Sequence, residues 1–320
     1  MKFVTDIIGE ELKAFESKFA EAVKSKTALL DTVMQYIIKR KGKQMRPMFV
    51  FLCAKMHGQI NESTYRAAAL VEMLHTATLV HDDVVDESME RRGFFSINAL
   101  WKNKIAVLVG DYLLSKGLLL STSHNEFEQL HIMSDAIRQM SEGELLQIEK
   151  TRKLNIDESV YFEIITNKTA SLLSSACGVG TYSTSQNVEI TNKMKLFGEK
   201  TGVAFQIKDD LFDYGTANIG KPTGNDIKEK KMTLPLIYTL NNVSADVRKK
   251  IIYIVKNNNT NKEKVKWVID TVVNTGGIKY AEIKMNAYRD EALDILNQFA
   301  PSKVSDALAA LVRYTTDRKY

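Results

Sequence analysis

The sequence Asp-Asp-x-x-Asp occurs twice in this chain, once in each half, and each copy is set in apolar sequence. On a helix, the first and last aspartates of a copy lie one turn apart and share a face, while the middle one lies about 100° round. Three carboxylates in one turn repel one another, so the arrangement persists most easily where a bound cation neutralises it. The two copies comprise Asp82, Asp83 and Asp86, and Asp209, Asp210 and Asp213.

These two acidic turns predict a metal site. A lone copy is more often a solvated acidic helix end, but two copies on two apolar helices can face each other across the cavity of a helix bundle. Oxygen ligands without a neighbouring cysteine favour a hard ion, and magnesium, which keeps waters and accepts phosphate co-ligands, fits best. We expect Asp82, Asp86 and Asp209 to bind the metal.

The composition predicts one large all-α domain over residues 1–320. This length exceeds the usual domain size, but no segment has the composition of a linker. Only four prolines interrupt the chain, and hydrophobic residues make up 44% of it, enough for a substantial core. We expect helices over residues 3–24, 29–38, 65–92, 97–120, 125–150 and 157–181, and a loop over 219–226.

Composition also bears on the compartment. Cys53 and Cys177 each lie in an apolar neighbourhood, which predicts buried free thiols in a reducing environment. No apolar run approaches the roughly 20 residues that a membrane span needs, and the N-terminus lacks a signal-peptide pattern. The net charge of +5 is modest and lysines are interspersed with acids, so nucleic-acid binding is not indicated. We therefore expect a soluble, cytoplasmic protein.

A third motif, Gly-Lys-Gln-Met-Arg-Pro at residues 42–47, precedes the first acidic turn. Together, in order and spacing, the three motifs resemble the signatures of the trans-isoprenyl (polyprenyl) diphosphate synthases, and the similarity extends over nearly the whole chain. It is greatest to the long-chain octaprenyl and heptaprenyl enzymes of bacteria. The resemblance implies the isoprenoid synthase fold, with two facing aspartate-rich motifs around a central cavity. It also implies a homodimer, for which the nearly all-round apolar segment 97–120 is suited.

The resemblance implies a reaction as well. Isopentenyl diphosphate would condense with an allylic diphosphate to give an all-trans polyprenyl diphosphate, with three Mg²⁺ ions bridging the aspartates to the allylic diphosphate. Pyrophosphate would leave, and the double bond of isopentenyl diphosphate would attack the resulting allylic cation. The product would serve as the side chain of a respiratory quinone.

Further residues match positions of the family with assigned roles. Those assigned to isopentenyl diphosphate are Lys43, Arg46, His75 and Arg92. Those assigned to the allylic diphosphate are Arg91, Lys168, Lys221 and Lys231. Thr169 and Gln206 are assigned to the region of the developing carbocation. Independently of the family, Lys168 lies in an otherwise uncharged stretch, where an unpaired ammonium would be costly and a diphosphate oxygen would offset that cost.

The residues before the first acidic turn predict a long product. In the family, the positions four and five residues before the first aspartate stand at the upper wall of the product tunnel, and short-chain enzymes commonly place an aromatic ring there. Here they are Thr78 and Ala77, with Leu74 next at helical spacing. Each added isoprene unit gains about 0.8 kcal/mol per buried CH₂-sized group, so an open tunnel predicts a product of about 30 to 50 carbons. A short-chain farnesyl or geranylgeranyl diphosphate synthase is the alternative.

Three other functions compete with this one. A class I terpene cyclase shares the first acidic motif, but its second metal site has an Asn/Ser/Glu pattern instead of repeated aspartates. A metal-dependent phosphohydrolase would use His81 beside Asp82, yet the five histidines form no obvious partner pattern. A non-catalytic subunit of a heteromer would typically have lost an acidic motif, and both motifs are intact here.

Overall fold

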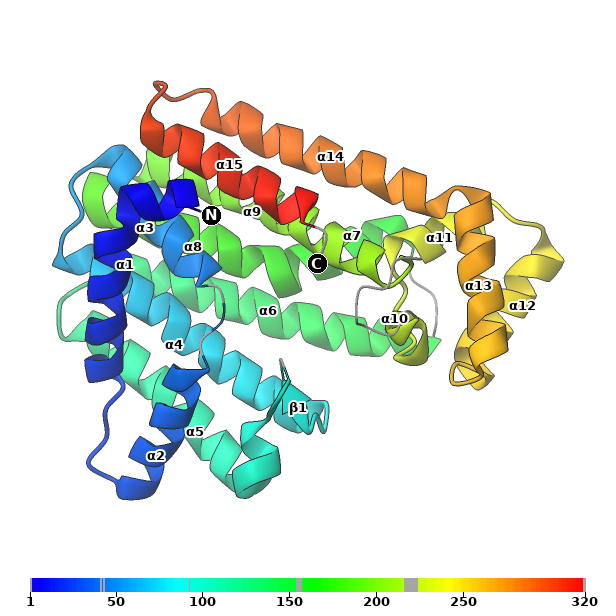
Figure 1. Ribbon diagram of the computed structural model, residues 1–320, viewed down its shortest axis with the longest axis horizontal. Helices are drawn as coiled ribbons and strands as arrows, with labels where there is room; N and C mark the ends of the chain where they lie inside the picture. Colours follow the sequence, from blue (N-terminus) through cyan, green and yellow to red (C-terminus); the bar gives the residue numbers. More distant parts are fainter. Residues whose placement is uncertain are drawn as a thin grey trace. The chain divides into compact units, whose positions relative to one another are not determined.

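The computed structural model describes residues 2–40, 42, 44–91, 93–153, 157–215 and 224–318, without the side chains of 152 and 153. Helices form most of it, and the first half contains a short antiparallel hairpin (Figure 1). The first elements are α1 (Lys2–Ala22), α2 (Ala28–Lys39), α3 (Met45–His57), α4 (Glu62–Val85), β1 (Glu90–Arg91), β2 (Phe94–Phe95) and α5 (Ile97–Thr122). Then follow α6 (Phe127–Lys153), α7 (Glu158–Ile165), the π-helical turn η1 (Thr166–Ala170), α8 (Ser171–Ser185) and α9 (Val188–Phe212). The last elements are α10 (Asn225–Lys228), α11 (Leu234–Asn241), α12 (Ala245–Asn257), α13 (Lys262–Thr275), α14 (Gly277–Leu296) and α15 (Lys303–Asp317).

The predicted all-α class is confirmed, and so are most of the predicted helices. Those over 3–24, 29–38, 97–120 and 125–150 correspond to α1, α2, α5 and α6, with a kink inside α1 at Ile8 and inside α5 at Lys102. Polar caps set several of the boundaries, because a side-chain oxygen can satisfy a backbone N–H that has no partner within the helix. The Ser96 hydroxyl, for example, accepts a hydrogen bond from a backbone N–H in the first turn of α5.

The single helix predicted over 65–92 is wrong at its C-terminal end. Helix α4 ends at Val85, and β1 and β2 then pair antiparallel. Glu87 adopts a left-handed backbone with φ 50°, and Gly93 follows with φ 77°. These two conformations cannot continue a right-handed helix, and the apolar periodicity of the sequence does not report them.

The helix predicted over 157–181 is interrupted by the π-helical turn. At its end, the N–H of Ser171 donates to the carbonyl oxygen of Thr166, five residues back. A π-turn accommodates one more residue than an α-helical turn and is frequent at functional sites. Here it carries Lys168 and Thr169, two of the predicted site residues.

The chain forms two compact units. Unit 1 comprises the residues up to Ile137, Leu172–Lys195 and Ala300–Leu308. Unit 2 comprises Arg138–Ser171, Leu196–Phe299 and the residues from Ala309 onward. The first acidic turn belongs to unit 1 and the second to unit 2, so the single domain over 1–320 stays a prediction.

Unit 1 is built around α4, which runs beside α5 (Figure 1). Aromatic rings fill the space between α1, α3 and α4. The Phe51 ring lies 5.8 Å from that of Phe15 and 5.2 Å from that of Tyr65, both in edge-on geometry, which aromatic pairs prefer. Cys53 and Cys177 are buried free thiols, as predicted, and burial raises the pKa of Cys177 well above its usual value.

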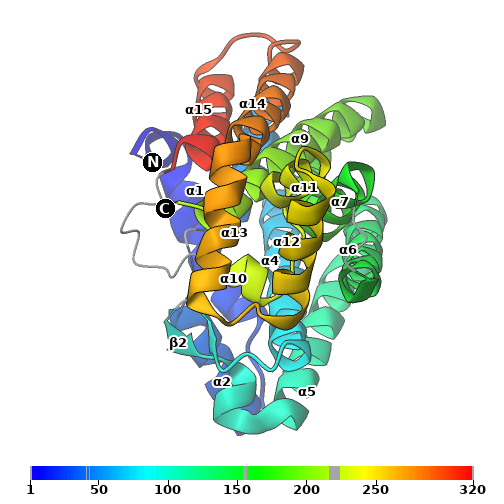
Figure 2. The same ribbon diagram turned by 90° about the vertical axis from the view of Figure 1, so that its right-hand side faces the viewer.

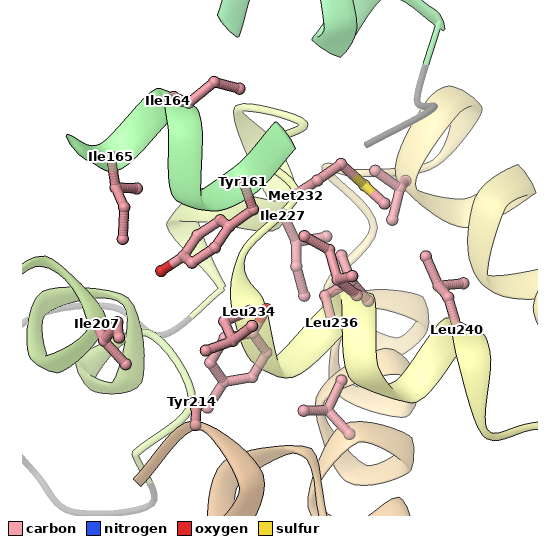
Figure 3. Close-up of a cluster of buried hydrophobic side chains, with 14 of the residues drawn as sticks. Tyr161, Ile164, Ile165, Ile207, Tyr214, Ile227, Met232, Leu234, Leu236 and Leu240 are labelled. Carbon is pink, nitrogen blue, oxygen red and sulfur yellow. The ribbon is translucent and has the colours of Figure 1, made fainter. Parts of the chain in front are cut away.

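Unit 2 has its own hydrophobic core, in which α11 packs against α7, α13 and α14. Helices α12 and α13 lie side by side at its edge (Figure 2). The core contains two buried tyrosines, Tyr161 and Tyr214, among aliphatic side chains such as Ile227 and Leu234 (Figure 3). The Tyr214 hydroxyl lies 2.6 Å from the Thr233 hydroxyl, so its polar end is satisfied inside the core.

Helix α5 differs from the expectation that no apolar run approaches the length of a membrane span. Within the described residues it is the one helix long and apolar enough to cross a membrane, judged by length and composition alone. A single helix of this kind is weak evidence for a span, because the core helix of a soluble protein can have the same length and composition. Its exposed side chains include Val107, Leu108, Leu118 and Leu119, whose spacing puts them on one face.

Candidate active site

The first acidic turn lies at the C-terminal end of α4. The N–H of Asp86 donates to the carbonyl oxygen of Asp82 at 2.8 Å, so the two aspartates are one turn apart as predicted. Asp82 is half-buried and Asp86 is exposed, whereas Asp83 is 3% exposed. The two accessible carboxylates of this turn are therefore the two predicted metal ligands.

Asp83 has a different environment. Its Oδ1 atom lies 2.7 Å from both Nε and Nη2 of Arg91, and its backbone carbonyl accepts a hydrogen bond from the Asn98 side chain at 3.2 Å. A nearly buried carboxylate needs such a partner, because an uncompensated buried charge is strongly destabilising. The ion pair ties the hairpin to α4, and it joins two residues that were predicted to act in the site.

His81 is held against α5. Its Nε2 atom donates to the carbonyl oxygen of Val107 at 3.2 Å, because a carbonyl can only accept. Gly110 faces the ring so closely that a Cβ there would collide with it. The His81 Nε2 atom is thus hydrogen-bonded to a backbone carbonyl and is not available to bind a metal. This disfavours the phosphohydrolase alternative, in which His81 would be a metal ligand.

Arg46, Glu72 and His75 form a cluster in unit 1. A guanidinium nitrogen of Arg46 contacts His75 Nε2, and another lies 3.4 Å from the Glu72 carboxylate. Because arginine only donates, His75 Nε2 accepts in this contact. The structure therefore brings together two residues assigned to isopentenyl diphosphate. Lys43 and Arg92, assigned to the same substrate, lie outside the described residues, as does Lys221, assigned to the allylic substrate.

In the second acidic turn, Asp210 is the inner carboxylate, 7% exposed. The Tyr161 hydroxyl donates to its Oδ2 at 2.7 Å, and the Gln206 amide donates to its Oδ1 at 2.9 Å. Figure 3 shows the Tyr161 hydroxyl directed toward α9, the helix that carries Ile207 and Asp210. Burial raises the pKa of Asp210 to about 6, although both hydrogen bonds oppose the shift. Burial also keeps Tyr161 protonated by raising its pKa well above 10.

A chain of hydrogen bonds connects this carboxylate to the π-turn. The Thr169 hydroxyl donates to the Gln206 carbonyl oxygen at 2.9 Å, and Gln206 in turn donates to Asp210. The structure thus groups three predicted site residues within unit 2. The orientation of the Gln206 amide follows from this network, since its oxygen must face the hydroxyl and its nitrogen the carboxylate.

Lys168 is not the unpaired ammonium that its sequence neighbourhood predicted. Its Nζ atom forms an ion pair with the Glu144 carboxylate and lies 3.4 Å from the Gln147 side-chain oxygen, both from α6. The uncharged stretch around Lys168 is local to the sequence, and the compensating charge comes from a neighbouring helix. The cost of an unpaired charge therefore no longer supports its assignment to diphosphate, which stays a prediction from the family match.

Asp213, just beyond α9, caps the short helix α10. Its carboxylate accepts hydrogen bonds from the backbone N–H of Asn225 at 2.7 Å and of Asp226 at 3.1 Å. Burial, followed by the charges of Asp210 and Asp213, raises the pKa of Asp226 to about 7. Lys231, assigned to the allylic diphosphate, pairs with Glu229 at 2.5 Å. The polypeptide after the second turn thus adds acids and a lysine beside the carboxylates.

The donor set fits a hard cation that takes ligands from substrate. Across the ranges that the structure describes, no three His, Cys, Asp or Glu side chains converge closely enough to hold a metal by themselves. Magnesium does not need such a cage, since it is usually bound by one or two carboxylates together with waters and phosphate oxygens.

The residues predicted to set the chain length lie in the buried part of α4. Ala77 is fully buried and Leu74 nearly so, while Thr78 is half-buried. A Cβ on Gly117 of α5 would lie 3.3 Å from Leu74, so the leucine packs directly against that helix backbone. Thus Ala77 is the small position and Leu74 the bulky one below it, as the sequence indicated.

The structure adds contacts that sequence reasoning did not predict. Tyr161 orients Asp210, Glu144 pairs with Lys168, and Arg318, after α15, pairs with Asp209. Tyr161 and Arg318 are 49 and 109 residues from their partners. No local pattern marks such contacts, although a basic residue at the C-terminus was visible in the sequence.

Acidic turns on apolar helices, with basic and hydroxyl side chains beside them, define the isoprenoid synthase class of all-helical enzymes. The family model named polyprenyl synthetase matches residues 27–272. The chain belongs to this family.

Individual relatives extend the match over the whole chain. The all-trans-nonaprenyl-diphosphate synthase (geranyl-diphosphate specific) of Rhodobacter capsulatus is 34% identical, over 97% of this chain and 96% of its own. A crystal structure of polyprenyl synthase from Caulobacter crescentus CB15, complexed with calcium and isoprenyl diphosphate, is 29% identical with a TM-score of 0.91, covering 100% of this chain and 98% of that chain. Geranylgeranyl pyrophosphate synthase from Bacteroides thetaiotaomicron is 35% identical with a TM-score of 0.84, covering 99% and 98%. The predicted family, fold and prenyltransferase class are confirmed.

Proposed function

We propose that this chain is a magnesium-dependent prenyltransferase that condenses isopentenyl diphosphate with an allylic diphosphate to make a long-chain, all-trans polyprenyl diphosphate. The observation that carries the proposal is the pair of intact Asp-Asp-x-x-Asp turns in a polyprenyl synthetase. The calcium and isoprenyl diphosphate bound in the Caulobacter structure support a divalent-metal site for diphosphate. We assign three Mg²⁺ ions, with Asp82, Asp86 and Asp209 as ligands.

The side chains of this enzyme would bind and orient the two substrates. Arg46 and His75 would bind isopentenyl diphosphate, and the family match assigns Arg91, Lys168 and Lys231 to the allylic diphosphate. Magnesium, when bound, would stabilise the charge of the departing pyrophosphate. Tyr161 and Gln206 hold Asp210 in one orientation, and Thr169 and Gln206 would lie near the developing allylic cation, as the family match implies. The alkene of isopentenyl diphosphate forms the new C–C bond, and a proton lost to pyrophosphate restores a double bond.

Overall identity does not decide the length of the product, because the nonaprenyl and geranylgeranyl relatives are equally similar to this chain. The small, buried Ala77 supports a product of about 30 to 50 carbons, since a longer tail gains hydrophobic free energy until a wall blocks it. We propose that the product is a quinone side-chain precursor made in the cytoplasm. The geranylgeranyl relative supports the alternative, a short-chain synthase.

The test is direct incubation. The purified protein would receive isopentenyl diphosphate, magnesium and, in separate reactions, geranyl, farnesyl or geranylgeranyl diphosphate, and the dephosphorylated products would be separated by chromatography. We expect a ladder ending at long prenyl alcohols, and none with a chelator. Hydrolysis without elongation would indicate a phosphohydrolase, cyclic hydrocarbons a terpene cyclase, and complete inactivity a non-catalytic subunit.

The two substrate sites should separate kinetically. Arg46→Ala should mainly raise the KM for isopentenyl diphosphate, and Lys168→Ala mainly that for the allylic substrate. Loss of one charge-assisted contact costs roughly 1.5 to 3 kcal/mol, or about a 10- to 150-fold weakening. Lys193→Ala is the matched control, because Lys193 pairs with Glu189 on the surface of α9. Equal increases in both Michaelis constants for each variant would contradict the division of sites.

We also propose a homodimer that buries the exposed apolar face of α5, defined by Val107, Leu108, Leu118 and Leu119. Burying a leucine side chain contributes about 1.5 to 3 kcal/mol, so a charge there should oppose association. Leu108→Glu should lower the molar mass in light scattering at micromolar concentration from dimer to monomer. Ile283→Glu, a change of an exposed apolar residue on α14, should leave the dimer intact. An active monomeric wild type would refute the dimer.

A further inference from the structure

Arg318 directly follows α15, and its side chain is only 16% exposed although it lies near the C-terminus. The guanidinium forms an ion pair with Oδ1 of Asp209, the predicted metal ligand of the second acidic turn. Its Nε atom also donates to the carbonyl oxygen of Thr315 at 3.2 Å, which turns the side chain back over the last helical turn.

Two aromatic rings complete this binding site. The guanidinium carbon lies 4.2 Å from the centroid of the Phe205 ring and 5.3 Å from that of Phe212. Phe205, Asp209 and Phe212 are spaced by four and three residues, so they share one face of α9. Arginine stacks on aromatic faces and pairs with carboxylates at the same time, which lysine does less well. The guanidinium therefore contacts three side chains of α9, whereas a typical surface ion pair makes a single exposed contact.

The other aspartates of this turn are held differently. The Asp210 carboxylate accepts hydrogen bonds from the Tyr161 phenol and the Gln206 amide, and the Asp213 carboxylate accepts them from two backbone N–H groups. Neutral donors leave the negative charge of a carboxylate available to a metal. A guanidinium neutralises that charge and repels a second cation at the same oxygen. Arg318 thus acts on the one aspartate of this turn that is assigned to the metal.

We propose that Arg318 and a divalent cation compete for Asp209, so that metal binding at the second acidic turn displaces the C-terminal arginine from α9. This inference rests on the proposed function, because it requires Asp209 to be a metal ligand. The arginine acts as an internal counter-ion that keeps the carboxylate neutralised and weakens the affinity of the free enzyme for metal. An arriving metal–diphosphate would have to release it.

Manganese binding to the full chain without substrates tests the competition, with electron paramagnetic resonance reporting the free ion. Arg318→Gln should tighten Mn²⁺ binding about tenfold, because the competing charge is gone. Arg318→Lys, which keeps the charge but loses the planar stacking, should lie between wild type and Arg318→Gln. Arg313→Gln is the matched control, since Arg313 is an exposed arginine of α15, the helix that precedes Arg318. In an Asp209→Asn background, Arg318→Gln should have no effect on metal affinity.

Hydrogen exchange supplies a second readout that does not depend on activity. Mn²⁺ should accelerate amide exchange in the last turn of α15, at Thr315 to Asp317, in wild type but not in Arg318→Gln. Unchanged or weaker Mn²⁺ binding by Arg318→Gln overturns the competition. If wild type binds Mn²⁺ with inorganic pyrophosphate and Arg318→Gln binds it identically, only this inference fails. If wild type binds no Mn²⁺ under either condition, the proposed metal-dependent function fails with it.

Discussion

Replacing Asp209 with alanine should lower the turnover number of the condensation by about 100- to 1,000-fold, and Asp82→Ala should have an effect of similar size. Both carboxylates are assigned to magnesium, and charge stabilisation of the departing pyrophosphate is the main catalytic effect expected in this reaction. Both side chains are accessible at the C-terminal ends of their helices, and Asp209→Ala also removes the ion-pair partner of Arg318. Radiolabelled isopentenyl diphosphate incorporated per minute at saturating substrate measures the loss.

Asp294→Ala is the matched control for these variants. Asp294 is exposed on α14 and far along the chain from either acidic turn, so its loss should leave turnover unchanged. Thermal denaturation should confirm that all three variants fold. Full activity in either motif variant, or of wild type in chelator, would refute the metal mechanism.

Replacing Ala77 with tyrosine should shorten the product to roughly 15 to 20 carbons, because the ring would occupy the space that the third or fourth isoprene unit needs. Ala77 is fully buried one turn above Leu74, and Leu74 packs against the backbone of α5 at Gly117. The ring therefore cannot move deeper along α4 without displacing a packed leucine. We expect it to project into the space that the growing tail would use.

Product length is the appropriate measurement, since the ratio of chain lengths does not depend on how much enzyme is folded. Introducing a ring at a buried alanine can cost about 1 to 3 kcal/mol of stability, which thermal denaturation would report separately. Ala77→Ser should keep the long product. A wild type that stops at 15 or 20 carbons, or an Ala77→Tyr variant that makes the full-length product at normal yield, would contradict the role given to Ala77.

The helical class could be predicted because it depends on local signals. Few prolines, apolar periodicity and caps such as Ser96 act within a few residues of the bond they influence. The hairpin after α4 escaped prediction because the left-handed backbone of Glu87 leaves no trace in apolar spacing. Apolar periodicity is a property of several helical turns together, whereas the left-handed conformation that follows the end of α4 belongs to the single residue Glu87.

The sequence identifies candidate residues for the site but not their partners. The aspartates are recognisable from motif spacing, and Lys168, Thr169 and Gln206 are recognisable from the family match. Their immediate environment is not, because Glu144 reaches Lys168 from α6, and Arg318, which follows α15, reaches Asp209 on α9. A charge that looks uncompensated in sequence is therefore weak evidence for a ligand. In the structure, Lys168 is paired with Glu144 and needs no diphosphate to compensate its charge. The guanidinium of Arg318 pairs with Asp209.

The π-helical turn at Thr166–Ala170 has a consequence for how this enzyme can vary. Its extra residue lets Lys168 face α6 while the neighbouring Thr169 reaches Gln206 on α9. Deleting one residue would permit ordinary α-helical bonding, but it would rotate one side of the segment by about 100° around the axis relative to the other. One of the two side chains would then lose its partner. The segment should accept substitutions of its outward side chains while tolerating no change in its length.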